Sequence, residues 1–269
     1  MFAQPATFAP YCGPGVAPVA LWATWNLDPW LLLGLAAFAA ATFAPALRRR
    51  AGLAPPDRRE ALALAAGHAV LVLAFVSPLC ALSSSLFSAR IGHHMLMIAV
   101  AAPLLVAGGA TRLLVPERPD GAPPRLSLTA ATLIHAALLW LWHAPLPYAW
   151  ALASPALYWL MELSLLGSAL LFWDALARRR EAVPAVLLTL VTFMAQMGLL
   201  GAILTFAPQP LYAFHLLTTA DWGLTPLEDQ QLAGLVMWVP GSVPYAVAGL
   251  LALAGWLNRR QLQERDGAA

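Results

Sequence analysis

Long runs of apolar residues recur seven times along this chain, separated by short segments that carry most of its polar residues. The runs cover residues 28–47, 60–82, 92–115, 126–142, 154–176, 182–206 and 230–257. Each is close to the ~20 residues that an α-helix needs to cross the hydrocarbon core of a bilayer. The strict apolar–polar alternation typical of a membrane β-barrel is missing. The pattern predicts an all-α integral membrane protein with a single bundle of seven transmembrane helices.

Composition agrees with this prediction. Of the 269 residues, 61% are hydrophobic and only 10% are charged, whereas a soluble domain carries roughly a quarter charged residues. The mean hydropathy is +0.71. We find no internal repeat, so we expect one membrane domain over residues 1–269. It would comprise an irregular Pro- and Gly-rich segment at 1–27, the bundle at 28–257 and a cytoplasmic tail at 258–269.

The distribution of basic residues predicts the orientation. Every basic residue is an arginine, and all but Arg90 fall in segments that would share one face of the membrane. The positive-inside rule then places the N-terminus outside and the C-terminus in the cytoplasm. In a bacterium this describes a multi-pass protein of the inner membrane, surrounded by lipid, with its functional loops toward the periplasm. The formal net charge of +2 gives no reason to expect nucleic acid as a partner.

The longest outer connection lies within residues 205–241 and is unusually polar for this chain. It contains His215, Asp221, Glu228 and Asp229. Loops of this kind, held between rigid elements, often carry function. The acidic residues have two simpler explanations: they solvate the loop, or Asp229 or its neighbour caps the last helix at the positive end of its dipole.

Histidines at the predicted outer face are candidate metal ligands. His93 and His94 begin the third run, His143 ends the fourth, and His215 lies in the long loop. Imidazole is a ligand for copper, zinc, iron and nickel. Met97 lies one helical turn from both His93 and His94, and thioether sulfur favours reduced copper. The alternative is that these are ordinary interfacial and core residues, because no pair has the close spacing of a zinc motif.

A second set of residues could bind metal or protons. It consists of Glu162, His135, Met194, Met197, Cys80 and Cys12. Glu162 lies well inside the fifth run, where a carboxylate must be protonated, paired or bound to an ion. His135 or His143 on the preceding run is its expected partner. Two cysteines are too few for a disulfide framework, and the sequence leaves open whether they meet.

Five sequence blocks resemble a known family. They are GHHMLMIAVAAPLLVAGG, LWHAPLPYAWAL, GSALLFW, MGLLGAILTFAPQPLY and GLTPLEDQQLAGLVMWVPG. In this order and spacing they resemble the polytopic CtaG-type cytochrome c oxidase assembly proteins, over residues from about 80 to 257. The resemblance implies a seven-span chaperone of respiratory-chain biogenesis, not an enzyme. Its implied partners are cytochrome c oxidase subunits and other copper chaperones, and its implied cargo is copper, held transiently.

The resemblance also suggests which residues matter. His94 and His143 match histidines of the family blocks, Asp229 and Gln230 match its acidic-Gln pair, and Trp238 matches the tryptophan that follows. Asp229, Gln230 and Trp238, together with Asp221, are candidates for contact with a partner or within the loop. The chain departs from the family at three positions, where it has Arg90, His93 and Glu162.

Two other functions remain open at this stage. The protein could be a cofactor-free scaffold that holds a nascent oxidase subunit through its apolar flank and outer loop. Alternatively, His68 and His135, both inside apolar runs, could ligate a b-type haem in an electron-transfer protein, although we do not expect haem.

Overall fold

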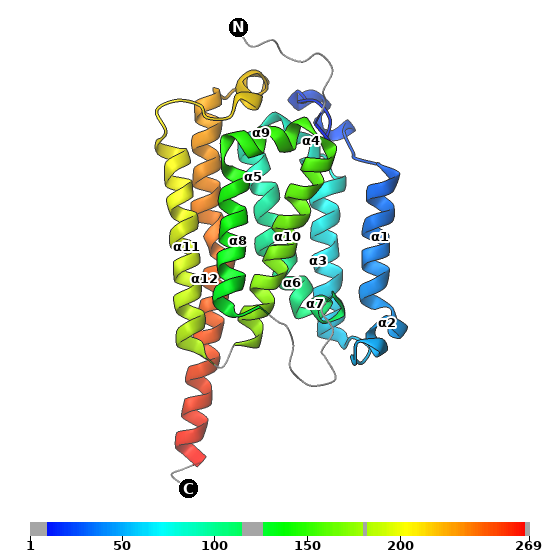
Figure 1. Ribbon diagram of the computed structural model, residues 1–269, viewed down its shortest axis with the longest axis vertical. Coiled ribbons are helices and arrows are strands. Elements are labelled where there is room, and N and C mark those ends of the chain that lie inside the picture. The colour runs from blue at the N-terminus through cyan, green and yellow to red at the C-terminus, as the bar shows by residue number, and fades with distance from the viewer. Residues whose placement is uncertain (1–9, 115–125, 180–181, 267–269) are drawn as a thin grey trace.

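The computed structural model describes residues 10–114, 126–179 and 182–266, and these are almost entirely helical (Figure 1). The α-helices are α1 (Pro29–Phe43), α2 (Pro45–Arg50), α3 (Arg58–Val76), α4 (Leu79–Ser85), α5 (Phe87–Met95), α6 (Ala102–Ala107), α7 (Ala110–Leu114), α8 (Leu128–His143), α9 (Pro145–Ala153), α10 (Pro155–Arg178), α11 (Val183–Phe206) and α12 (Pro226–Asp266). Short 3-10 helices are η1 (Pro18–Ala23), η3 (Ala213–Leu217) and η4 (Ala220–Trp222), and a π-helical turn, η2 (Leu96–Ala101), joins α5 to α6.

Five helices are long and apolar enough to cross a membrane, so the chain is an integral membrane protein. They are Arg58–Val76, Phe87–Ala107, Pro155–Arg178, Val183–Phe206 and Pro226–Arg265. The two other predicted spans correspond to shorter apolar helices, α1 with 15 residues and α8 with 16. The all-helical class predicted from the sequence is therefore confirmed, whereas seven crossings and their orientation stay predictions.

Most of these helices start at residue types that favour a helix N-terminus. Proline occupies the first turn of α1, α2, α9 and α10, where its missing N–H would have no helical partner. Side chains of Asp28, Asp57, Ser127 and Ser154 accept hydrogen bonds from backbone N–H groups at the start of α1, α3, α8 and α10. Such caps satisfy donors that would otherwise be unpaired.

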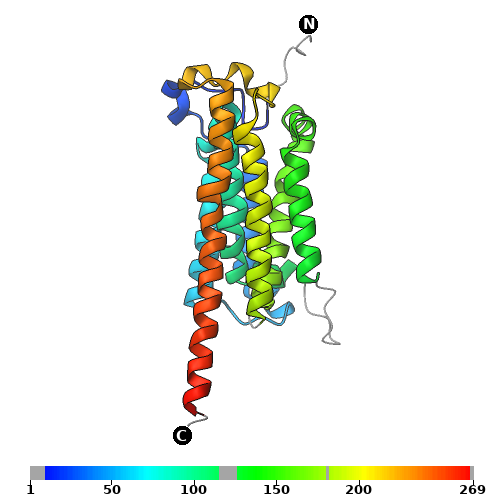
Figure 2. The ribbon, with the colours of Figure 1, turned by 90° about the vertical axis from the view of Figure 1, so that its left-hand side faces the viewer.

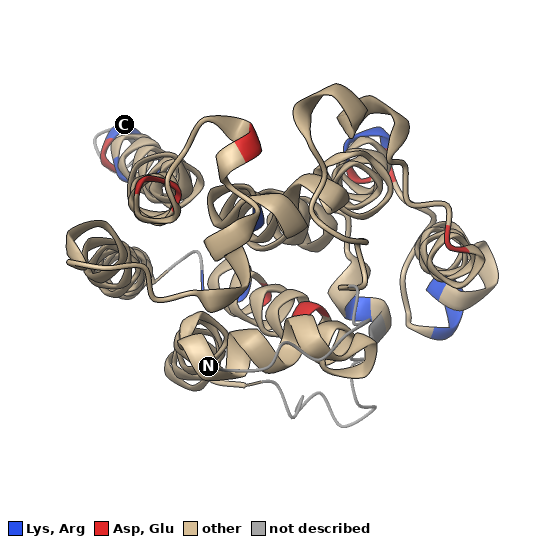
Figure 3. Ribbon diagram, turned by 90° about the horizontal axis from the view of Figure 1, so that it is seen from above, with Lys and Arg blue, Asp and Glu red and all other residues tan. Residues whose placement is uncertain are grey.

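The two ends of the bundle are called upper and lower, as they stand in Figure 1. The upper end carries η1, α4, α9 and the connection between α11 and α12. The lower end carries α2, α7 and the C-terminal part of α12, which extends well below the other helices. Figure 3 shows how sparse charged positions are along the helices when the bundle is viewed from above.

The tightest helix pair is α11 with α12, which run side by side in Figures 1 and 2. Gly201 and Gly234 bring the two backbones together: a Cβ at Gly201 would lie 2.8 Å from the Gly234 carbonyl oxygen, and a Cβ at Gly234 would overlap the Gly201 carbonyl. Trp238 covers the same contact, with its Cδ1 3.1 Å from a Cβ built at Gly198. The glycines of α11 thus form a helix-packing surface against α12.

We expect Gly234→Val to separate α11 from α12, because the clash is with backbone and no side-chain movement relieves it. The measurement is the thermal unfolding temperature of the purified protein in detergent. Gly167→Val is the matched control, because a Cβ there meets no atom within 4 Å. A Gly234 variant that unfolds at the same temperature as the control would contradict this packing.

Candidate functional site

A buried group of ionisable side chains lies between α5 and α10 in the upper half of the bundle. Glu162 Oε1 accepts from Arg90 Nη1 at 3.4 Å and lies 3.3 Å from His94 Nε2. Glu162 Oε2 lies 3.7 Å from His93 Nε2. All four side chains are at most 1% exposed. Charges so deeply buried persist only when paired, and Arg90 supplies the compensating charge for Glu162.

The helical repeat places these residues on one face. Residues 90, 93 and 94 are three and four positions apart on α5, so their side chains emerge together toward α10. Tyr158, one turn before Glu162 on α10, lies under the guanidinium of Arg90, with its ring centroid 5.3 Å from Cζ. The π-helical turn η2 follows the two histidines directly, and Trp173 Nε1 donates to the Ile98 carbonyl within it. Such turns recur at functional sites.

His143 joins this group from α8. Its ring centroid lies 6.0 Å from that of His94. Its Nδ1 lies 2.6 Å from the Leu139 carbonyl oxygen, which makes Nδ1 the protonated nitrogen and leaves the lone pair on Nε2. Nε2 of His143 and Nδ1 of His94 are both buried, and neither has a hydrogen-bond partner among the described residues. In each ring, one nitrogen is thus held by an oxygen and the other is free to bind.

The partner expected for Glu162 was wrong. The sequence suggested His135 or His143 on the neighbouring span, but the contacts come from α5. Arg90 was assigned to the outer face as the single exception to the positive-inside pattern, and it is instead fully buried. The sequence did contain a signal for this position. Arg90 lies three and four residues before His93 and His94, so on a helix the three side chains share one face.

His215 lies above this group and has both ring nitrogens occupied. Nε2 lies 2.7 Å from the Tyr148 hydroxyl, and Nδ1 lies 3.4 Å from the Ser85 carbonyl oxygen. Burial, helped by the positive charge of Arg90, lowers the pKa of His215 to about 3, so the ring is neutral at ordinary pH. His215 therefore fastens the upper connection to α4 and α9 and offers no free nitrogen.

Residues of the 205–241 stretch hold the upper end together. Asp229 was a candidate cap for its own helix, but its carboxylate accepts from the backbone N–H groups of Phe87 and Ser88 and so caps α5. Its neighbour Glu228 forms the local cap, accepting from the N–H and hydroxyl of Thr225. Asp229 thereby fixes the start of the helix that carries the two histidines.

The other candidate contact residues divide between buried and exposed positions. Gln230 accepts from Leu211 N–H at 2.6 Å and donates to the Leu204 carbonyl at 3.1 Å, which ties the connection to the end of α11. Trp238 is half exposed over the α11 glycines. Asp221 is exposed in η4.

The two cysteines, whose pairing the sequence left open, form a disulfide between Cys12 and Cys80. The bond joins the N-terminal segment to α4 at the upper end. Sγ of Cys12 lies 3.4 Å from the Tyr158 hydroxyl, so the disulfide rests directly above the Arg90–Tyr158 contact. In this oxidised form neither sulfur is a thiolate ligand.

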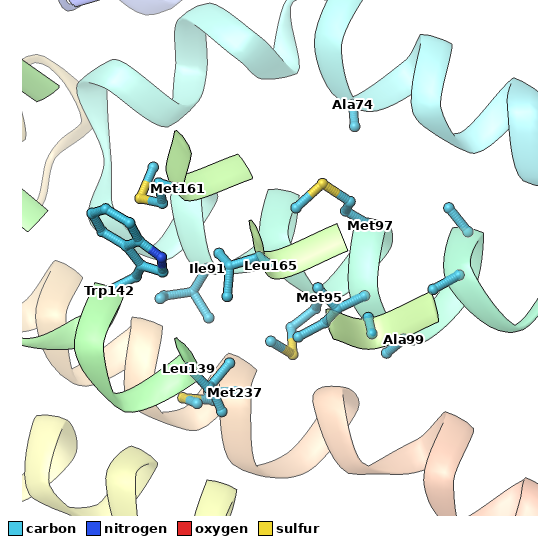
Figure 4. Packing of buried hydrophobic residues seen from close by; sticks show 14 of the residues in the cluster. Ala74, Ile91, Met95, Met97, Ala99, Leu139, Trp142, Met161, Leu165 and Met237 are labelled. Atoms are coloured by element: carbon cyan, nitrogen blue, oxygen red, sulfur yellow. The ribbon is translucent and has the colours of Figure 1, made fainter. Parts of the chain in front are cut away.

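Several methionines lie in the apolar core. Figure 4 shows Met97, Met95, Met161 and Met237, which come from η2, α5, α10 and α12, among the buried hydrophobic residues. Met97 is fully buried one turn below His93 and His94. The two other candidates, Met194 and Met197, lie on α11, which packs chiefly against α12 and α8.

His68 and His135 occupy separate surroundings. His68 Nε2 lies 2.9 Å from the Thr42 hydroxyl, between α3 and α1. His135 Nδ1 lies 2.9 Å from the Ser168 hydroxyl, and its ring stacks on Phe193 of α11. The two rings pack against different helices, so they are not placed as the two axial ligands of one haem.

A lateral cavity of about 460 Å³ leads along α10 toward the site. Tyr11 and Asp28 line its upper part, and Met97 and Glu162 are among the residues at its inner wall. Among the described residues, no group of three or more His, Cys, Asp or Glu side chains is arranged to hold a metal ion. The arrangement thus offers unpartnered imidazole nitrogens on His93, His94 and His143 beside a neutralised carboxylate, and not a closed metal site.

The buried ion pair makes a quantitative prediction. Glu162→Gln or Arg90→Met alone leaves one buried group without its partner and should cost about 3–5 kcal/mol of unfolding free energy. The double variant should cost clearly less than the sum, as measured by denaturant unfolding in mixed micelles. The partly exposed pair Arg178–Asp174, whose side chains are 28% and 16% exposed, is the control. Arg178→Met should cost less than about 1 kcal/mol. Additive effects at Arg90 and Glu162 would contradict a direct pairing.

One of the comparisons with known proteins finds a family. No curated protein and no solved structure matches the chain. A family model described as cytochrome c oxidase caa3 assembly factor matches residues 36–259, from within α1 to within the C-terminal part of α12. Members of this family are assembly factors and generally not catalysts. The chain belongs to the cytochrome c oxidase caa3 assembly factor family.

Proposed function

We propose that this protein delivers copper to a caa3-type cytochrome c oxidase during its assembly, capturing the ion between His94 and His143. The observation that carries the proposal is the pair of buried nitrogens, His94 Nδ1 and His143 Nε2, that have no hydrogen-bond partner. In both rings the opposite nitrogen contacts an oxygen, from Glu162 or from the Leu139 carbonyl. Metal-binding histidines are oriented in the same way.

The separation of the rings supports capture of one ion by two imidazoles. A ring nitrogen binds such metals at about 2.0 Å, so two rings on opposite sides of one ion have centroids roughly 6 Å apart. The observed 6.0 Å is compatible with this arrangement. His93 is a third candidate donor: among the described residues both its nitrogens lack a hydrogen-bond partner, and its ring centroid lies 5.8 Å from that of His94.

The charge balance favours reduced copper as cargo. Arg90 neutralises Glu162, so the group carries no net charge to attract a divalent ion into the apolar interior. Cu(I) adds a single charge and accepts few ligands, and the thioether of Met97 one turn below suits it. A site with two or three ligands also releases its ion stepwise, as transfer to an oxidase subunit requires.

We further propose that all seven apolar helices cross the bacterial inner membrane, with the upper end toward the periplasm. The arginines of α2, α7 and the C-terminal part of α12 gather at the lower end, which supports a cytoplasmic location for that end. The copper site then lies in the outer half of the membrane, where an extracytoplasmic donor or an oxidase subunit can reach it through the lateral cavity.

The direct test measures copper bound to protein purified in detergent and reconstituted with reduced copper. Near-stoichiometric copper is expected for the wild type, with at least a tenfold loss in His94→Ala/His143→Ala. His68→Ala/His135→Ala is the matched control: it also removes two buried imidazoles, and it should retain copper. Equal retention by both double variants, or a wild type that binds no copper, would reject delivery and favour the cofactor-free scaffold.

A further inference from the structure

A second cavity, at the lower end of the bundle, is larger than the one beside the candidate copper site. Its volume is about 1200 Å³, and it lies among α2, α6, α7, α10, α11 and α12. In Figure 1 the ends of these helices lie at the lower end of the bundle, and α12 continues past them. Nothing in the copper proposal uses this cavity.

Arginines dominate the polar part of its lining. Arg50, Arg112, Arg178 and Arg259 contribute from four different helices, and all four side chains are exposed. Within the part of the chain that the structure describes, the one acidic residue lining the cavity is Asp174.

Local contacts already neutralise the nearby acids. The two carboxylate oxygens of Asp174 accept from the Thr111 hydroxyl at 2.9 Å and from Arg178 Nε at 2.8 Å. Glu60, which lies 3.9 Å from Arg112, is held at 2.9 Å by the buried Arg48. The cavity therefore keeps an excess of positive charge, centred on Arg50, Arg112 and Arg259.

The deeper wall of the cavity is apolar. Val106, Trp173 and Leu190 line its interior and are buried. Leu251 lines it as well and is 68% exposed, so the apolar wall continues onto the outer surface of α12. On a membrane-spanning helix, that surface faces lipid chains. A cationic rim thus meets an apolar wall that opens sideways to the bilayer.

We propose that this lower cavity binds an anionic phospholipid, with the phosphate among Arg50, Arg112 and Arg259 and the acyl chains along the wall that ends at Leu251. Guanidinium groups bind phosphate oxygens through paired, charge-assisted hydrogen bonds. Basic pockets between transmembrane helices recognise anionic head groups. A free phosphate compound would use the rim but gain nothing from the apolar wall, so the wall favours lipid.

The test compares two triple variants that remove the same charge at the same end of the bundle. Arg50→Gln/Arg112→Gln/Arg259→Gln alters the cavity, whereas Arg49→Gln/Arg59→Gln/Arg260→Gln alters neighbouring arginines that do not line it. Native mass spectrometry of protein in neutral detergent, titrated with phosphatidylglycerol or with phosphatidylcholine, counts the bound lipids.

We expect the cavity variant to bind phosphatidylglycerol about tenfold more weakly than the wild type, and the control variant to change less than twofold. Phosphatidylcholine should bind weakly to all three proteins. Equal losses in the two variants would show nonspecific attraction to the charged end and overturn the proposal. Inorganic phosphate at millimolar concentration should not displace phosphatidylglycerol from the wild type. If it does, the arginine rim binds a free anion, and the lipid proposal is overturned as well.

Three single variants keep the proposal falsifiable if the triple variant does not fold. Arg259→Gln and Arg260→Gln each remove one of two adjacent arginines on α12. We expect Arg259→Gln to weaken phosphatidylglycerol binding at least threefold more than Arg260→Gln does. Ala252→Phe fills part of the apolar wall without altering charge. It should reduce phosphatidylglycerol binding, and no reduction would contradict the placement of the acyl chains.

Discussion

A single buried ion pair, between Arg90 of α5 and Glu162 of α10, constrains how the upper half of this protein can be arranged. Neither charge is tolerable in an apolar interior without the other. Their pairing fixes the rotation of α5 against α10, and the helical repeat then brings His93 and His94 to the same interface. The imidazoles that define the candidate site are therefore positioned by an electrostatic requirement of the membrane interior.

The polar stretch between α11 and α12 supports this interface and does not supply its ligands. Asp229 caps α5, and His215 binds Tyr148 and the Ser85 carbonyl. Tyr212 donates to the His143 carbonyl. Together with the Cys12–Cys80 disulfide, these contacts cover the upper end with a fixed layer. The blocks that identify the family thus combine ligand candidates with the residues that hold them in place.

The sequence predicted the all-helical class because apolar runs of this length are a local signal, and it identified Glu162 as anomalous. It could not show what Glu162 faces, since pairing between α5 and α10 depends on the rotation of two helices in three dimensions. The same limit explains two misses, the buried position of Arg90 and the capping of α5 by Asp229. It also explains why the Cys12–Cys80 disulfide was left open. Contacts between residues distant in sequence leave no local pattern.

The most direct test of the central claim is X-ray absorption spectroscopy of the protein loaded with Cu(I). Capture between His94 and His143 predicts a first shell that contains at least two imidazole nitrogens at about 2.0 Å. The characteristic outer-shell scattering of the imidazole rings should disappear in His94→Ala/His143→Ala. A shell composed of sulfur alone, or a spectrum unchanged by that double substitution, would contradict the account.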